Sequence, residues 1–367
     1  MKANNLFTVS LSELKTPTQQ NMGTGGASRI MHHRDNPRRS YLQSNQLGPL
    51  PLPFAAERIA ECQTQTLFSY HQASSTLGSF VLMNTDNLPS GGKITEEYTH
   101  KDSVSIKLVG DIGLRGNRQA QVAKIIGYSV RESKRNNQHP LVLVVGDWVY
   151  PRGPSEDSPN EIKRIQNSVL NNYFDLTKKC SVRGVLGNHE YGDNQKAADP
   201  SVFINLAKQY NMTVDRYGRH SIHSKHFIVE LYSIDSTTIA VDDQQVEWII
   251  QELTESLNRE QEHGKKTWRL VVSHHPIVSF GLHQGETNYL GSLFDTQSID
   301  FWLSGHEHDI EIIAQGPNNP PTLVSGTGST QREIEQNQKA AYMTNECGFL
   351  ELNIHEQDIK VNIKRIE

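Results

Sequence analysis

Short runs of β-branched and other apolar residues recur at intervals along the chain from about residue 103 onward. Runs of this length, bounded by Gly, Pro, Asn and Asp, predict buried strands. The predicted strands occupy residues 105–109, 141–145, 182–186, 227–232, 268–272, 299–303 and 322–324. Between several of them apolar residues repeat at helical spacing. This spacing predicts amphipathic helices over residues 118–133, 162–176 and 244–260.

The end of the chain, from residue 348, alternates between apolar and polar positions, which predicts a closing hairpin. Strands that alternate with helices indicate the α/β class. They predict a largely parallel sheet with helices on its faces.

The first hundred residues have a different composition. Residues 1–102 are rich in Gln, Ser, Thr, Asn, Gly and Pro, and such segments supply little apolar surface for a core. We therefore expect a polar N-terminal extension over residues 1–102, largely irregular to about residue 60, before a folded domain over residues 103–367. Residues 66–83 are apolar enough to pack against that domain as two short strands.

The net charge and hydropathy of the chain indicate whether nucleic acid or a membrane is an expected partner. The chain has 367 residues, a formal net charge of −5 and no long run of Lys or Arg. This charge does not favour nucleic acid or an anionic membrane, so we expect no nucleic-acid binding. No stretch approaches the roughly 20 apolar residues of a membrane-spanning helix, so no membrane span is expected.

The cysteines and the N-terminal residues indicate the kind of cellular compartment in which the protein works. Cys62, Cys180 and Cys347 lie far apart, which argues against a disulfide framework and suits a reducing compartment. The first residues lack the apolar core of a secretory signal peptide. We expect the protein to work in a cytoplasm or to be exported by a specialised route that does not read a cleaved signal.

Polar side chains that can bind metal follow five of the predicted strands directly. In a parallel sheet, binding sites form from the loops beyond the carboxyl ends of the strands. Carboxylate, amide and imidazole groups make a mixed oxygen and nitrogen ligand set suited to iron, zinc or manganese. They are too many for one tetrahedral ion and indicate two ions that share a bridging carboxylate. The residues are Asp111, Asp147, Asn188, His189, His274, His275, His306 and His308.

The order of these motifs resembles the metallophosphoesterase, or calcineurin-like, superfamily. Over roughly residues 103–365 the chain is most similar to the small, tartrate-resistant type of purple acid phosphatase. The resemblance implies a four-layer αββα sandwich with a metal site on loops at the carboxyl ends of strands. Residues 103–367 would then form a metallophosphoesterase catalytic domain. The motifs are GD-x-G at 110–113, GD-x-x-Y at 146–150, GNH at 187–189, V-x-x-H at 271–274 and GH-x-H at 305–308.

One departure from the superfamily pattern supports the narrower resemblance. Most metallophosphoesterases have a metal-binding histidine two residues after the first aspartate, and this chain has Gly113 there. Purple acid phosphatases use the tyrosine of their GDxxY motif on the same metal, and Tyr150 occupies that position. A phenolate is a hard anionic oxygen, which favours a trivalent ion over Zn²⁺ or Mg²⁺.

The resemblance also implies which residues bind each metal ion. The first ion, Fe³⁺, would be held by Asp111, Tyr150 and His308. The second ion, Fe²⁺, Zn²⁺ or Mn²⁺, would be held by Asn188, His274 and His306. Asp147 would bridge the two ions. A metal-bound hydroxide would attack phosphorus and hydrolyse a phosphomonoester.

Further residues near these ligands have implied or suggested roles. His189 and His283 resemble the family's phosphate-contacting histidines, and His189 would also protonate the leaving group. His275 neighbours a ligand, so it would either support that ligand or lie on the surface. Arg115 and Arg152 are candidates for contact with substrate phosphate. Three acidic neighbours are expected to be solvated or to support ligands, namely Glu190, Glu307 and Asp309.

The same metal core allows alternative activities. A protein serine/threonine phosphatase shares the GNHE motif, but the glycine at position 113 and the paired histidines of GHEH count against it. A phosphodiesterase or nucleotide pyrophosphatase uses nearly the same core, and the shape of the pocket sets the leaving group. A non-catalytic binding module with this fold is expected to lack ligands, and none is missing here. The expected substrate is a phosphorylated small molecule or a phosphoprotein.

Overall fold

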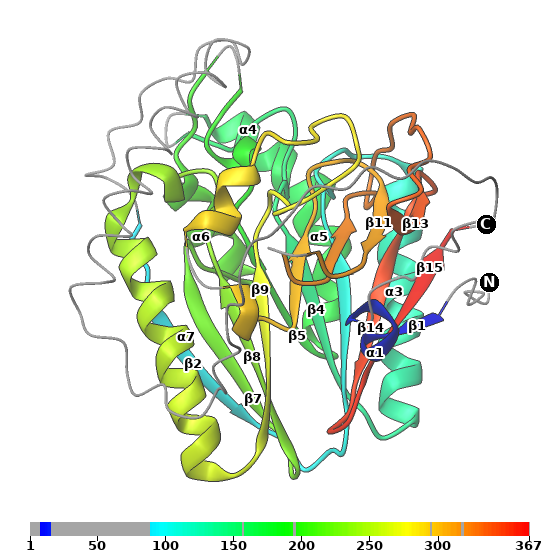
Figure 1. Cartoon of the computed structure of the whole chain (residues 1–367). Coiled ribbons are helices and arrows are strands. Elements are labelled where there is room, and N and C mark those ends of the chain that lie inside the picture. Colours follow the sequence, from blue (N-terminus) through cyan, green and yellow to red (C-terminus); the bar gives the residue numbers. More distant parts are fainter. Residues whose placement is uncertain are drawn as a thin grey trace, which may run out of the picture.

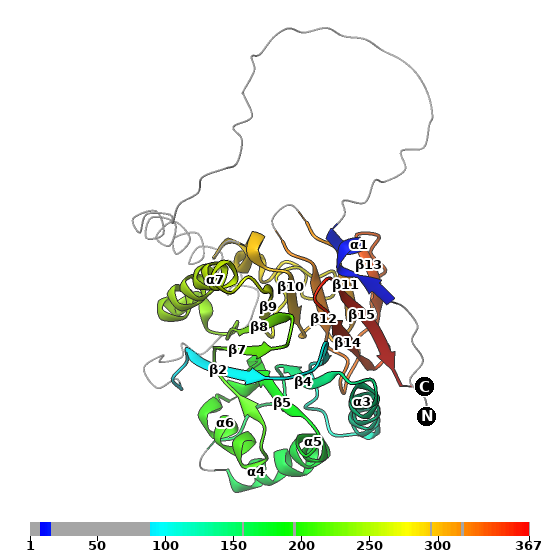
Figure 2. The ribbon, with the colours of Figure 1, turned by 90° about the horizontal axis from the view of Figure 1, so that it is seen from below.

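Two β-sheets lie face to face in the computed structural model, and helices cover both outer faces (Figures 1 and 2). The structure describes residues 8–15, 89–155, 158–193, 196–293, 296–316 and 319–366. The arrangement is the four-layer αββα sandwich that the motif resemblance implied, so that prediction is confirmed. No helix among these residues is long and apolar enough to cross a membrane.

Both sheets mix parallel and antiparallel neighbours. The seven-stranded sheet has the order β1 (Thr8–Ser10), β15 (Ile359–Arg365), β14 (Gly348–Ile354), β3 (Val104–Val109), β4 (His139–Val145), β5 (Ser181–Val185) and β6 (Thr213–Val214). The eight-stranded sheet has the order β13 (Ala340–Thr344), β11 (Ile310–Ile313), β12 (Thr322–Ser325), β10 (Phe301–Ser304), β9 (Lys266–Val272), β8 (Phe227–Ser233), β7 (Gly218–His223) and β2 (Lys93–Tyr98). Within the first sheet β3, β4, β5 and β6 run parallel, and within the second β8, β9, β10 and β12 do.

The helices are divided between the two outer faces. The seven-stranded sheet is covered by α3 (Asn117–Arg135), α4 (Pro159–Ile165), α5 (Asn171–Thr177) and α6 (Pro200–Gln209), with a π-helical turn, η2 (Gln166–Leu170), joining α4 to α5. The eight-stranded sheet is covered by α7 (Asp243–His263).

The apolar run in β4 shows why these strands form the centre of the fold. Successive side chains of a strand point to opposite faces of the sheet. Leu141 and Leu143 therefore pack in the core between the two sheets, whereas Val142 and Val144 pack under the helices. All four are buried, as expected for a strand covered on both faces, which reads as a continuous apolar run.

The seven strands predicted between residues 105 and 324 are present, with ends that differ by no more than two residues from those observed. The interpretation of a single, largely parallel sheet was wrong, because the strands are divided between two mixed sheets. The described elements that were not predicted include β1, α1, β2, β6, α6, β7, β11 and β13. The sequence of β7, GRHSIH, has no apolar run, and its Arg219 and His220 are buried as partners in ion pairs.

The N-terminal stretch contributes to both sheets. β1 pairs antiparallel with β15, and the short helix α1 (Leu11–Lys15) follows it. Val9, Leu11 and Leu14 are buried in the core between the sheets. β2 pairs parallel with β7 at the edge of the eight-stranded sheet. The stretch predicted as an extension therefore supplies two strands to the domain. Residues 16–88, including the strands predicted within 66–83, lie outside the described residues.

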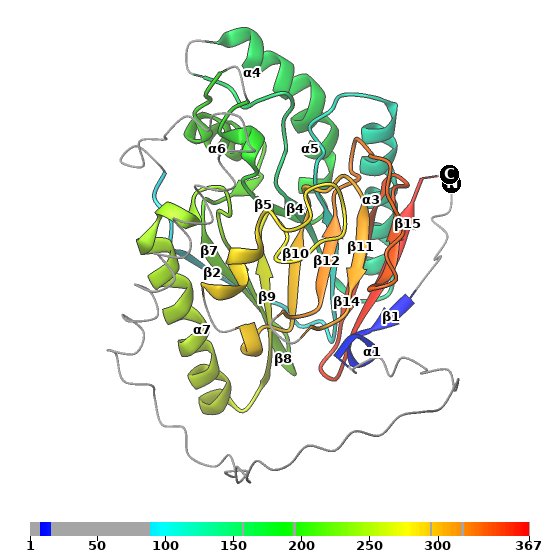
Figure 3. The same cartoon turned by 45° about the horizontal axis from the view of Figure 1, so that its top comes forward.

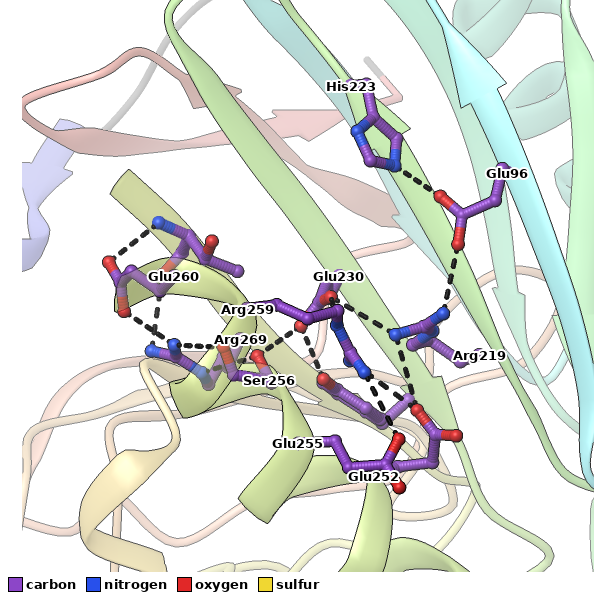
Figure 4. Close-up of polar contacts among 12 residues, drawn as sticks. Glu96, Arg219, His223, Glu230, Glu252, Glu255, Ser256, Arg259, Glu260 and Arg269 are labelled. Atoms are coloured by element: carbon purple, nitrogen blue, oxygen red, sulfur yellow. Dashed lines mark hydrogen bonds and ion pairs between the residues drawn. The ribbon is translucent and has the colours of Figure 1, made fainter. Parts of the chain in front are cut away.

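Buried charged side chains join α7 to the eight-stranded sheet (Figure 4). The carboxylate of Glu230 on β8 lies 3.4 Å from the Arg219 guanidinium of β7 and 3.1 Å from that of Arg259 on α7. Arg219 also pairs with Glu252 on α7 at 3.3 Å and with Glu96 on β2 at 3.0 Å. Loss of one partner would leave a buried charge uncompensated, so the network restricts how α7 can sit on the sheet.

Candidate metal centre

The loops that follow β3, β4, β5, β9 and β10 meet at one edge of the sandwich (Figure 3). β3, β4 and β5 are parallel neighbours in one sheet, and β9 and β10 are parallel neighbours in the other. Backbone hydrogen bonds join the loops, since the Asp111 N–H donates to the Gly146 carbonyl at 3.1 Å and the Gly305 N–H donates to the His274 carbonyl at 2.9 Å. The structure brings together in these loops all the residues that the sequence suggested as ligands, namely Asp111, Asp147, Tyr150, Asn188, His274, His306 and His308.

A first group of donor atoms surrounds the Tyr150 hydroxyl. The hydroxyl oxygen lies 2.9 Å from Asp111 Oδ1, 2.9 Å from Asp147 Oδ2 and 3.0 Å from His308 Nε2. His308 Nε2 is 3.2 Å from Asp111 Oδ1. Four atoms from three loops therefore converge on one point with a phenol, two carboxylates and an imidazole.

A second group surrounds His274. Its Nε2 lies 3.0 Å from Asn188 Oδ1, 3.3 Å from His306 Nδ1 and 3.4 Å from Asp147 Oδ1. His274 Nδ1 lies 2.9 Å from the Val145 carbonyl, which can only accept, so Nδ1 carries a proton and Nε2 is the atom that faces the group.

Asp147 belongs to both groups through different oxygens. Its Oδ2 faces Tyr150, and its Oδ1 faces His274. Oδ1 also accepts the backbone N–H of His189 at 3.1 Å. A carboxylate placed in this way can hold one cation on each oxygen.

The electrostatics of the site suit cations. Burial and the Asp111 and Asp147 carboxylates raise the pKa of Tyr150 well above its usual value. Burial works against a charged His274, but Asp147 raises the pKa of this histidine to about 10. Burial likewise opposes ionisation of Asp147, yet His274 holds the pKa of that carboxyl well below its usual range. Metal ions would supply the positive charge that these buried oxygens attract, so the donor set fits metal ions.

Four of the candidate ligands adopt the left-handed backbone region. The φ angles are 57° at Asp111, 50° at Asp147, 74° at His306 and 56° at His308. Non-glycine residues rarely occupy this region, and strained residues of this kind persist where the surrounding structure enforces them, often at functional sites. At His306 one hydrogen bond helps to hold this backbone conformation, because the His306 N–H donates to Asp111 Oδ2 at 2.9 Å.

Gly113 is packed too tightly to carry a side chain. A Cβ atom added there would lie 2.4 Å from the backbone carbonyl carbon of Val149 and 2.6 Å from its Cα. The Gly113 N–H donates to the Asp147 carbonyl at 3.1 Å, which holds the two loops together. Tyr150, the next residue after Val149, reaches the first group of donor atoms instead.

His189 lies beside the first group. Its Nδ1 contacts the Pro151 carbonyl, so Nδ1 donates and Nε2 is left free of that bond. Nε2 is 3.9 Å from Asp147 Oδ2, and the ring packs edge-on against Tyr150 with centroids 4.6 Å apart. The ring is partly exposed, as expected for a side chain that can reach substrate.

His283 and Glu286 form a pair at the rim of the second group. His283 Nδ1 lies 2.9 Å from Glu286 Oε1, and Glu286 Oε2 lies 3.8 Å from His306 Nε2. His283 Nε2 has no hydrogen-bond partner among the described residues. Because Nδ1 donates to the carboxylate, this free Nε2 can serve as a substrate contact. The sequence interpretation did not identify Glu286.

His275 packs against the second group without reaching its centre. Its ring lies 4.9 Å from that of His274 and 4.4 Å from that of His306. Its Nδ1 lies 2.9 Å from the Ser236 hydroxyl. Burial and His306 lower its pKa well below the usual value. Of the two roles left open by the sequence, support of the ligands agrees with these contacts.

The acidic neighbours of the motifs are buried rather than solvated. Glu190 accepts the backbone N–H groups of Gly187 at 2.6 Å, Asp147 at 3.1 Å and Val149 at 3.2 Å. Glu307 accepts the backbone N–H of His283 at 2.9 Å. Asp309 is also buried. Each directly follows a candidate site histidine in the sequence, a signal that could have indicated a supporting role.

Arg152 does not face the candidate ligands. Its guanidinium pairs with Asp193 at 2.9 Å and with Glu161 at 3.0 Å, so the sequence-based suggestion of a phosphate contact is wrong for this structure. Arg115 is exposed.

Comparison with known proteins gives concordant results. A calcineurin-like phosphoesterase family model matches residues 104–309. Purple acid phosphatase 17 of Arabidopsis thaliana is 24% identical over 268 residues, which cover 68% of this chain and 75% of the relative. Purple acid phosphatase 4 of the same plant is 26% identical over 241 residues, which cover 62% of this chain and 68% of the relative. A solved structure described as GAP50, the anchor in the inner membrane complex of Plasmodium, shares the fold. It aligns with a TM-score of 0.54 at 18% identity, over 72% of this chain and 84% of that chain.

Proposed function

The chain belongs to the calcineurin-like phosphoesterase family, and on this premise we propose that it is a purple acid phosphatase-like enzyme that hydrolyses phosphomonoesters at a centre of two metal ions. The family and the purple acid phosphatase relatives make it a hydrolase of phosphoesters that uses metal ions. The narrower proposal adds the number of ions, their ligands and the type of phosphatase.

One observation carries the narrower proposal. The Tyr150 hydroxyl lies within 3.0 Å of Asp111, Asp147 and His308, at the point where other metallophosphoesterases use a histidine from the first loop. Gly113 has no room for that histidine. A phenol among two carboxylates and an imidazole is a site for a hard, highly charged cation, which supports Fe³⁺ over Zn²⁺.

The residues that would hold each ion follow from the two groups of donor atoms. The first ion would be held by Asp111, Tyr150 and His308, and the second by Asn188, His274 and His306. Asp147 would contribute one oxygen to each. The second group offers an amide and two imidazoles, which suit Fe²⁺, Zn²⁺ or Mn²⁺. When bound, the ions would lower the pKa of a water molecule and neutralise the phosphate oxygens.

The protein's own side chains would position the phosphoester and supply protons. His189 has a partly exposed ring whose Nδ1 is taken by the Pro151 carbonyl, and His283 Nε2 is buried without a hydrogen-bond partner among the described residues. In the protonated imidazolium form, Nε2 of either ring would donate to a phosphate oxygen, and His189, beside Asp147, would pass this proton to the leaving oxygen. The carboxylate of Glu286 holds the ring of His283 through Nδ1.

The test is the visible spectrum and metal content of protein purified in air, compared with a Tyr150→Phe variant. Tyrosinate on Fe³⁺ should give a broad visible charge-transfer band, with about two metal ions per chain. The band should disappear in Tyr150→Phe. A matched control is Tyr173→Phe, because Tyr173 is fully buried in the helical layer and its loss should leave the band unchanged.

A colourless protein that holds Mn or Zn, with activity indifferent to Tyr150→Phe, would contradict the tyrosinate assignment. The chain would then be a general metallophosphoesterase, and phosphodiesters and phosphoproteins would be the first substrates to assay.

A further inference from the structure

A cavity lined by lysines opens at the end of the sandwich opposite the metal centre. It has a volume of about 700 Å³ and includes the first residues of β4 and β5, His139 and Ser181. The candidate ligand Asp147 follows the other end of β4. Eight residues of extended chain separate His139 from Asp147, which corresponds to roughly 25 Å. The cavity is therefore distinct from the metal centre.

The charge of the cavity is opposite to that of the whole chain. Lys101, Lys134, Lys178 and Lys179 line it, against a single carboxylate, that of Glu97. The whole chain has a formal net charge of −5. The cavity is therefore a local concentration of positive charge in an acidic protein.

The carboxylate of Glu97 lies beside two histidines. It lies 3.1 Å from His139 Nε2 and 3.2 Å from His220 Nε2. Hydrogen bonds from these two histidines hold its pKa well below the usual range. Glu97 thus keeps its single negative charge beside the histidines, and the four lysines outnumber it.

Three of the four lysines lack an acidic partner within the described part of the chain. Lys178 pairs with Asp175 at 2.9 Å, and Lys101 contacts the side chain of Asn137. No carboxylate pairs with Lys134 or Lys179 among the described residues. Lys134 lies in the last turn of α3 and Lys179 just beyond α5, where cations also interact favourably with helix carbonyls. Lys101 lies in the loop before β3, so helix ends do not account for the whole set.

The remaining lining residues restrict the ligand to a class. Thr177, Ser181, Asn211 and Gln138 offer hydroxyl and amide groups. The described lining residues include no Phe, Tyr or Trp on which a nucleobase could stack, and the imidazole of His139 is held beside Glu97. None of the large hydrophobic side chains that are exposed in the described structure lines the cavity, so a lipid tail would have no large apolar side chain to pack on there. The volume lies within the range of about 300–1,000 Å³ typical of small-molecule sites.

We propose that this cavity binds a compact, non-aromatic polyanion that carries several phosphate or sulfate groups. Lysine ammonium groups act as point charges toward such groups, and their spread around the cavity suits several anionic groups rather than one. Cys180 also lines the cavity, but burial raises the pKa of its thiol to about 11. A neutral thiol is a poor nucleophile, so binding is non-covalent. The inference does not depend on the proposed phosphatase activity.

The experiment is calorimetric titration of the metal-loaded protein with inositol hexasulfate, which is not a phosphoester and is not consumed. We expect one molecule to bind per chain. A Lys134→Gln/Lys179→Gln double variant should bind at least tenfold more weakly. The matched control is Lys124→Gln, which removes an exposed lysine of α3 that does not line the cavity. Binding to the control should equal that of the wild type.

Two further measurements keep the result interpretable. Because Lys101 lies outside any helix, Lys101→Gln should weaken binding without changing the midpoint of thermal unfolding. Phosphatase kcat/KM on a small substrate should be the same in the double variant and the wild type. Absence of binding to the wild type at physiological ionic strength would overturn the proposal. Equal affinity of wild type and double variant would also overturn it, because the anion would then be bound at the metal centre or elsewhere.

Discussion

Substitutions of Glu190 test quantitatively how the loops that carry the candidate ligands Asp147, Tyr150 and Asn188 are held together. Its carboxylate accepts three backbone N–H groups, from Gly187, Asp147 and Val149, and it is fully buried. Glu190→Ala would leave all three donors without an acceptor. A buried donor left unsatisfied costs about 1–3 kcal/mol. Even at the lower bound for each donor, the variant should lose about 3 kcal/mol in the free energy of unfolding.

Glu190→Gln separates the hydrogen bonds from simple burial. A glutamine can keep its carbonyl oxygen in the place of Oε2, which serves Gly187 and Asp147. Its NH₂ group would then face the Val149 N–H, so one hydrogen bond is lost, at a cost of about 1–3 kcal/mol. Stability should therefore fall in the order wild type, Gln variant, Ala variant.

The assay is urea unfolding of the metal-loaded protein, together with metal content. Glu132→Ala on the exposed side of α3 serves as a control and should change stability by no more than about 0.5 kcal/mol. Because the three N–H groups belong to the loops that carry Asp147, Tyr150 and Asn188, metal content should fall along with stability. A loss below about 1 kcal/mol in Glu190→Ala, or equal losses in both variants, would refute the reasoning.

The remaining predictions concern stability outside the site. Glu230→Ala should cost about 3–5 kcal/mol in urea unfolding, because it removes a buried carboxylate that pairs with the buried Arg219 and the half-buried Arg259. Glu255→Ala, which removes an exposed partner of Arg259, should cost under about 1 kcal/mol; similar losses in the two variants would contradict the role of burial. Burial lowers the pKa of Lys107 from 10.5 to about 8, so between these values the unfolded chain binds more protons and the free energy of unfolding rises with pH. Between pH 7.5 and 9.5 the free energy of unfolding of the wild type should rise by about 1–2 kcal/mol relative to that of Lys107→Met. If denaturation curves give the same difference between the two proteins at both pH values, this prediction is wrong. Deletion of residues 1–15 should uncover β15 as a sheet edge and increase aggregation in light scattering, and an equally monodisperse protein would show that β1 does not protect that edge.

The central strands and the candidate ligands were predictable for the same physical reason. A strand buried on both faces is a continuous apolar run, and residues 141–145 of β4 and 270–272 of β9 read that way. Polar residues directly after such runs must lie at the carboxyl edge, so Asp147, Asn188 and His274 could be placed before any coordinates were known. The distances between their donor atoms could not, because they depend on the stacking of two sheets.

The elements that were missed have sequences that do not show their burial. β7 has the sequence GRHSIH, and its buried positions include charged side chains whose partners lie on β2, β8 and α7. No local pattern reveals that such residues are inside. The same holds for Glu190 and Glu307, which look like solvated acids until the N–H groups that they accept are known. β1 has only three residues and forms a strand because β15 is there to pair with it.

The contact between Gly113 and Val149 has a consequence for attempts to redesign this centre. The space in which a histidine side chain at position 113 would begin is filled by the main chain of the neighbouring loop. Moving that main chain would move Tyr150 with it, since the two residues are adjacent in sequence. A single substitution therefore cannot replace the phenol with an imidazole. Both loops would have to be exchanged together. A chimera that carries both loops from a histidine-type relative would test whether ligand identity and metal preference are inherited as one structural unit.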